Sequence, residues 1–134
     1  MIVYILEHRR QIDDEYYDTK MIGIYSSQEK VQNTVKEYLS LSGFSQYPND
    51  FNIIPYNLKI KCLSNNTVYL LTGVKLVDDD ELTVSYDVYK NKVQSFFVFL
   101  IRMITRKKNG AQKFYIERYK INKNEWQEGF VILK

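Results

Sequence analysis

The chain has 134 residues, of which 45% are hydrophobic and 26% charged, and its formal net charge is +3 at pH 7. This length and balance are those of one globular domain with a hydrophobic core, and they favour an ordered chain over a disordered one. The charge is too small to indicate a nucleic-acid-binding protein by itself, because such domains usually gather many basic residues on one face.

The lone cysteine and the longest apolar run bear on where the protein resides. Cys62 has no second cysteine to pair with, so no internal disulfide can form, which favours the reducing cytoplasm. The apolar run at residues 96–101 is far shorter than the roughly 20 residues that a membrane span needs. The N-terminus also lacks the basic start and long apolar stretch of a signal peptide. We therefore expect a cytoplasmic protein with no membrane segment.

The sequence opens with a predicted β-hairpin. Residues 2–7 and 19–25 are rich in β-branched and aromatic residues, as strands are. The charged residues Asp13, Asp14 and Glu15 lie between them and predict the tip of the hairpin.

A helix and a third strand follow. The segment SSQE, residues 26–29, has the spacing of a capping box, in which Ser and Glu satisfy free backbone N–H groups at a helix start. Gly43 predicts the end of this helix, because glycine adopts the left-handed turn at low cost. Residues 51–58 then predict a strand. The apolar residues of the helix recur at helical spacing: Val31, Val35, Tyr38 and Leu39.

The same order of elements then starts again. VYILEHRRQIDD, residues 3–14, is matched by VYLLTGVKLVDD, residues 68–79, and residues 82–89 predict the returning strand. NKVQ, residues 91–94, predicts a second capped helix, and a strand from Phe114 follows. The acidic residues of the second hairpin tip are Asp78, Asp79, Asp80 and Glu81. Four apolar residues of the second helix correspond in the repeat to Val31, Val35, Tyr38 and Leu39 of the first helix. They are Phe96, Leu100, Met103 and Ile104.

The repeated order predicts an α+β fold with two tandem β-β-α-β units, at about residues 1–60 and 66–123, in one compact pseudo-twofold domain spanning 1–134. We expect mostly antiparallel sheet, as one sheet or two facing sheets, with both helices packed on it. The alternative is a single α+β domain whose strands look alike by propensity. The tail, residues 124–134, could add an edge strand or close the core with Trp126 and Phe130.

The second helix is apolar on more than one stripe, since FFVFLI occupies residues 96–101 without interruption. We expect these side chains to belong to the core. The alternative is an exposed patch that a partner covers.

Several motifs resemble a small bacterial domain family of unknown function. They are VYILEH from Val3, IGIYSSQEKV from Ile22, GFSQYPNDF from Gly43 and YKINKNEWQEGF from Tyr119. The resemblance covers residues 1–56 and 114–131, with a second β-β-α block apparently inserted before the closing motif. It implies a fold and no active site. In size and style the chain is also similar to immunity proteins that block bacterial toxins, which is an analogy only.

The sequence does not predict an enzyme. His8 and Cys62 could form a catalytic dyad only if their side chains touched, and their contexts, a strand and a linker, do not predict contact. We expect His8 at the surface or at a strand end. The sequence holds no phosphate-binding glycine loop and no serine- or zinc-hydrolase motif. We therefore expect no catalytic residues, no cofactor and no metal.

The acidic hairpin tips are the candidate partner-binding residues. Carboxylates attract divalent cations, but the EF-hand spacing is absent here, and acidic hairpin tips are often simply solvated. A contact surface for a basic protein is the functional interpretation, because complementary charge speeds association. The residues are Asp13, Asp14, Glu15, Asp78, Asp79, Asp80 and Glu81.

A basic segment between Arg102 and Lys120 is the alternative site. Its cations could neutralise phosphates while Phe114, Tyr115 and Tyr119 stack on bases, although helix capping and a solvated strand face would give the same pattern. The candidate nucleic-acid-binding residues are Arg102, Arg106, Lys107, Lys108, Lys113 and Arg118.

From these features we expect a non-enzymatic protein that binds a cognate protein. The leading hypothesis is an immunity or antitoxin-like inhibitor that occludes a bacterial toxin. A nucleic-acid-binding or regulatory protein and a small-ligand-binding module between the two units are the alternatives.

Overall fold

The computed structural model describes residues 1–60, 63, 65–105, 110–126 and 128–130. The predicted order of elements is present twice, which confirms an α+β fold with two β-β-α-β units. The elements of the first unit are β1 (Ile2–Gln11), β2 (Tyr17–Tyr25), α1 (Gln28–Tyr38), a short 3-10 helix η1 (Phe44–Gln46) and β3 (Phe51–Asn57). Those of the second unit are β4 (Thr67–Val77), β5 (Asp80–Tyr89), α2 (Lys92–Thr105) and β6 (Lys113–Lys120).

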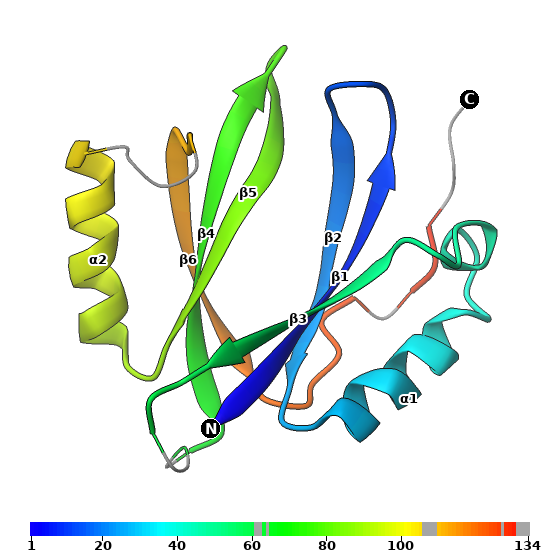
Figure 1. Cartoon of the computed structure of the whole chain (residues 1–134), viewed down its shortest axis with the longest axis horizontal. Helices are drawn as coiled ribbons and strands as arrows, with labels where there is room; N and C mark the ends of the chain where they lie inside the picture. Colours follow the sequence, from blue (N-terminus) through cyan, green and yellow to red (C-terminus); the bar gives the residue numbers. More distant parts are fainter. Residues whose placement is uncertain (61–62, 64, 106–109, 127, 131–134) are drawn as a thin grey trace.

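Within the described residues, the strands form two antiparallel sheets with the orders β2-β1-β3 and β5-β4-β6. The first strand of each unit is therefore the central strand of its sheet. Figure 1 shows the two sheets facing one another, with α2 on the outer side of one and α1 on the outer side of the other. Of the two expected arrangements, the chain adopts two facing sheets.

Alternation along the central strands builds a core between the sheets and a further core under each helix. Ile5 and Leu70 point between the sheets, whereas their neighbours Leu6 and Leu71 point toward the helices. Both units contribute to the core between the sheets. Its buried members are Val3, Ile5, Ile24 and Leu58 from the first unit and Val68, Leu70, Val88, Tyr119 and Ile121 from the second.

The two hairpins turn by different means and point to the same end of the molecule (Figure 1). In the first tip, the carboxylate of Asp13 accepts hydrogen bonds from the backbone N–H groups of Glu15 and Tyr16, both at 2.9 Å. In the second, Asp78 and Asp79 have φ values of 49° and 70°. A two-residue hairpin turn needs such positive φ values to match the strand twist.

The helix caps differ in part from the expectation. Asn91 caps α2 as expected, and its side-chain oxygen lies 2.7 Å from the N–H of Gln94. Ser27, rather than Ser26, caps α1 by accepting from the N–H of Lys30 at 3.2 Å. Gly43 is left-handed with φ 85°, but it precedes η1 and does not end α1, whose C-cap is Leu39.

The tail returns across the first unit. The N–H groups of Asn122 and Glu125 donate to the carbonyls of Ile24 and Ile22, at 2.8 and 2.7 Å, along the edge of β2 that β1 leaves open. Phe130 then packs on the core under α1. The expected closing of the core holds for Phe130, whereas Trp126 stays 36% exposed.

Candidate functional site

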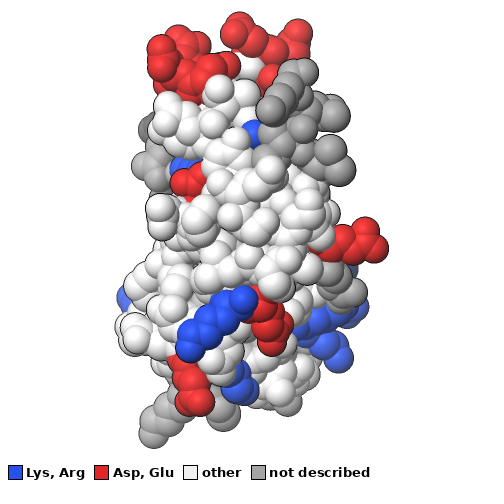
Figure 2. Space-filling view, turned by 90° about the vertical axis from the view of Figure 1, so that its right-hand side faces the viewer, with Lys and Arg blue, Asp and Glu red and all other residues white. Residues whose placement is uncertain are grey.

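The acidic hairpin tips come together at one end of the molecule. Glu15 and Asp78, from different hairpins, line the same hollow of about 440 Å³. Burial raises the pKa of Tyr16, and the nearby charge of Asp80 on the other hairpin raises it further. Figure 2 shows the acidic side chains gathered at the top of the molecule. We call this surface the acidic end; it comprises Asp13, Asp14, Glu15, Asp78, Asp79, Asp80 and Glu81.

The acidic end combines carboxylates with apolar surface. Leu76 and Leu82 line the hollow between the tips together with one cation, Lys75, and Leu76 is 41% exposed. The structure holds two of the carboxylates in internal contacts, since Asp13 caps its own turn and Glu81 accepts from the hydroxyl of Tyr115. An apolar centre with a charged rim is the composition of many protein interfaces.

The acidic end does not have the arrangement of a metal site. Among the described residues, no three side chains of the metal-binding types lie close enough together to hold an ion. Carboxylates on exposed turns are also well hydrated, so they do not need a cation to balance their charge.

The described residues of the basic segment do not form one surface. Arg102 turns inward, where its guanidinium pairs with the buried carboxylate of Asp87 and lies 6.0 Å from the ring centre of Phe114. Its guanidinium is therefore paired within the protein, and its assignment to a nucleic-acid-binding surface stays a prediction. Lys113 and Arg118 are exposed on β6. Arg106, Lys107 and Lys108 lie outside the described residues.

The outward side of α2 is the largest departure from expectation. The expected burial of the run at residues 96–101 is wrong for Phe96, Phe97, Leu100 and Ile101, because each is between 43% and 64% exposed. The side of α2 that meets the sheet instead carries Ser95, Val98, Phe99 and Arg102. We call the outward side the apolar face of α2; it comprises Val93, Phe96, Phe97, Leu100, Ile101 and Met103.

The corresponding side of α1 is polar. Positions that face water on α1 hold both signs of charge, which are visible on the face of the molecule in Figure 2. They are Glu29, Lys30, Gln32, Asn33, Lys36 and Glu37. The apolar face of α2 is therefore not a requirement of this architecture.

His8 is a core residue, so the expected surface position is wrong. Its ring is fully buried and meets the rings of Phe44 and Phe51 edge-on, at 4.9 and 4.8 Å between centres. Its Nε2 lies 3.0 Å from the carbonyl oxygen of Tyr47, and burial lowers its pKa. Cys62, the other member of the hypothetical dyad, lies outside the described residues.

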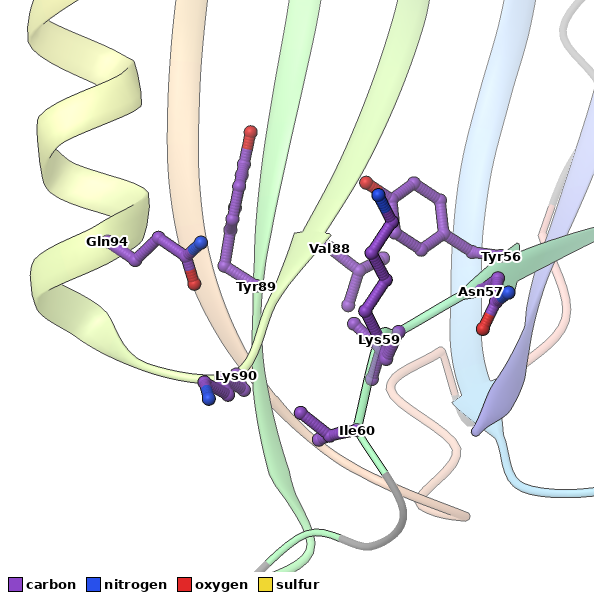
Figure 3. Close-up of a pocket in the computed structure, with 9 residues that line it drawn as sticks. Tyr56, Asn57, Lys59, Ile60, Val88, Tyr89, Lys90 and Gln94 are labelled. Carbon is purple, nitrogen blue, oxygen red and sulfur yellow. The ribbon is translucent and has the colours of Figure 1, made fainter.

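A cavity of about 270 Å³ lies at the opposite end from the acidic tips (Figure 3). It is formed where β3 and β5 end and α2 begins, so it lies between the two units as a ligand-binding cleft would. Lys59 and Lys90 contribute ammonium groups, and Gln94 extends from the first turn of α2. The sequence predicted a cleft but not these residues, because they meet only through the packing of the sheets.

Residues 1–64 match the model of a family described as a domain of unknown function, DUF7336. This confirms the resemblance to an uncharacterised domain family for the first unit, while the closing motif at residues 119–130 lies outside the match. No curated protein and no solved structure matches the chain. Within the described part of the chain, no helix has the length and apolarity that crossing a membrane requires.

Proposed function

We propose that this chain is a non-enzymatic protein that uses its acidic end to cover a basic surface of a cognate protein. The leading form of the proposal is an immunity or antitoxin-like inhibitor that blocks a toxin's active site. The observation that carries it is the convergence of two separate acidic hairpin tips around one hollow.

The net charge of the whole chain is positive, so the acidic end is a local feature. A concentrated negative field of this kind accelerates the encounter with a basic partner and orients it. The exposed Leu76 in the hollow supplies apolar contact area that charge alone would lack. Toxins that cleave nucleic acids have basic active sites, and an acidic protrusion fits such a site sterically and electrostatically.

The first experiment captures partners from the source cell with the tagged chain, with and without nuclease. Under this proposal, one protein is recovered in stoichiometric amount and survives nuclease treatment. That protein should arrest growth when expressed alone and should be harmless when this chain is expressed with it. A partner without toxicity would overturn the inhibitor role and leave protein binding in place.

The second experiment tests the acidic end with the purified partner. Neutralising Asp79 and Asp80 with D79N/D80N should slow association about tenfold at low salt, with little effect at high salt. Asn is chosen because it tolerates the left-handed conformation of Asp79. The matched control, E29Q/E37Q, removes the same charge from exposed positions of α1 and should leave the rate unchanged. Equal rates for both variants would exclude the acidic end from the interface.

The cavity between the units supports a second candidate function, the binding of a small anion. Lys59 and Lys90 line it, and their positive charge favours carboxylate or phosphate ligands. Inorganic phosphate and small dicarboxylates should then raise the unfolding temperature of the chain, and K59M/K90M should abolish the effect. An equal rise in both proteins would show a general salt effect and exclude this site.

A further inference from the structure

The apolar face of α2 has no role in either proposed activity. Val93, Phe97 and Ile101 are 71%, 64% and 55% exposed. With about 100 Å² of apolar surface on each of its side chains, the face leaves roughly 600 Å² in water, the upper end of what monomeric proteins show. An exposed face of this size indicates an interaction surface.

We propose that a second copy of the same chain covers this face, so that the protein forms a twofold dimer through α2. The exposed residues are spaced three and four apart along the helix, from Val93 through Phe96 and Phe97 to Leu100 and Ile101. This spacing makes a continuous stripe on one side of a helix. Such stripes pack against one another in pairs of helices.

The absence of charge on the face argues for a copy of itself as the partner. Between Val93 and Met103, the charged residue is Arg102, and it turns inward to Asp87. A twofold interface sets a surface against itself, so it is stable only where like charges do not meet. Between Val93 and Met103, a partner recognised by charge would find no outward-facing charge to pair with.

The area is sufficient for a stable dimer. Two such faces brought together remove roughly 1,200 Å² from water, which is at the lower end of specific protein interfaces. The pairing also stops at two copies, because the equivalent outward side of α1 is polar. The acidic end lies at the hairpin tips rather than on α2 (Figure 1), so it stays open in this dimer.

Light scattering or sedimentation of the full chain over a wide concentration range tests the proposal. The expected mass at high concentration is twice the 16.1 kDa of one chain. The variant F97E/I101E should be monomeric at every concentration, with an unfolding temperature no lower than that of the monomeric wild type, because both positions are exposed in the monomer. A monomeric wild type, a dimer that survives the substitutions, or a larger assembly would overturn the proposal.

A matched control places the same charges on the other helix. Asn33 and Glu37 precede Phe97 and Ile101 by 64 residues, the interval between the buried residues Val31 and Ser95. The variant N33E therefore gives α1 the same pair of carboxylates, and it should remain dimeric. Loss of the dimer in N33E would show a general charge effect and overturn the assignment to α2.

Mixing complementary variants identifies the occupant. F97E/I101E and F97K/I101K should each be monomeric alone and should form a mixed dimer when combined, since acidic and basic faces then meet across the interface. Monomers that stay separate when mixed would show that another occupant covers the face. Binding of the wild type to neutral lipid vesicles as a monomer would identify that occupant as a membrane surface and overturn the proposal.

Discussion

At the scale of single residues, the polar groups that look most available in the sequence are internal. Arg102 and His8 both occur where chemistry was conceivable, in a basic segment and beside two arginines. The fold places Arg102 against Asp87 and seals His8 among aromatic rings. Both side chains therefore contribute to the stability of the fold, and substitution of either should change the free energy of unfolding.

Replacing Arg102 with Met should lower the free energy of unfolding by about 3 kcal/mol, because a buried carboxylate then loses its cation. The Arg102 and Asp87 side chains are only 17% and 10% exposed, so water replaces the lost contact poorly. Urea unfolding at neutral pH measures the change. Arg118→Met, at an exposed position of β6, is the control and should change stability little. Equal losses in the two variants would contradict the structural role of the pair.

His8 should make the protein less stable in mild acid. Burial lowers the pKa of His8 in the folded chain below the ordinary value of 6.5, so the folded chain holds this ring neutral. The unfolded chain gains a proton at this residue as the pH falls through about 6.5, and it therefore binds more protons than the folded chain. The contribution of His8 is complete above that pH and is lost progressively as the pH falls toward the lowered pKa.

Urea unfolding between about pH 7.5 and 5.5 checks this expectation. The variant His8→Gln keeps an N–H donor near the carbonyl of Tyr47, which accepts from Nε2 in the wild type. It should be less stable overall and should show a weaker loss of stability toward acid. Parallel curves for the two proteins would assign the acid sensitivity to other groups.

At the scale of elements, the two helices show which features sequence can predict. The spacing of apolar residues, the residue propensities and the charged hairpin tips locate the helices and strands, because each of these signals lies within a short stretch of sequence. The outward side of α2 could not be predicted from the apolar run at residues 96–101, because apolar character alone does not tell a core face from an interface. An alignment of the repeat from Ser26 is also one residue off at the helices, and one residue rotates a helix by about 100°. With Ser27 aligned to Asn91, the buried Val31 corresponds to the buried Ser95.

The choice between the two serines depends on a distant part of the chain. The hydroxyl of Ser26 contacts the side chain of Asn122, 96 residues later, and this leaves Ser27 to cap the helix. No pattern within residues 26–29 contains that information. The same limit applies to the acidic end, since each tip could be predicted but their convergence depends on how the two sheets pack.

The cap assignment gives a test of its own. Ser27→Ala should lower the free energy of unfolding by about 1 kcal/mol, because the N–H of Lys30 loses its acceptor at the start of α1. Thermal or urea unfolding measures the loss. Ser45→Ala, an exposed serine whose side chain makes no hydrogen bond among the described residues, is the matched control and should have little effect. A loss of equal size in both variants would contradict the capping role of Ser27.

At the scale of the whole molecule, the two units are not independent. The family match ends at residue 64, yet Val3, Ile5 and Ile24 of this segment pack against the second unit between the sheets. The tail of the second unit also covers the open edge of β2. Each unit therefore completes the core of the other, as the two subunits of an obligate dimer do.

This interdependence predicts that residues 1–64 and 65–134, made as separate fragments, do not fold as monomers. Each alone should be unfolded or self-associated, because it exposes the apolar face that normally lies between the sheets.

Mixed in equal amounts, the two fragments should form a folded one-to-one complex. Trp126 is the only tryptophan, and its backbone carbonyl accepts from the hydroxyl of Tyr38, so its fluorescence should change as the tail docks. The variant Ile5→Asp in the first fragment puts a carboxylate between the sheets and should prevent assembly. A 1–64 fragment that sediments as a monomer and unfolds cooperatively would show instead that the first unit is a complete domain.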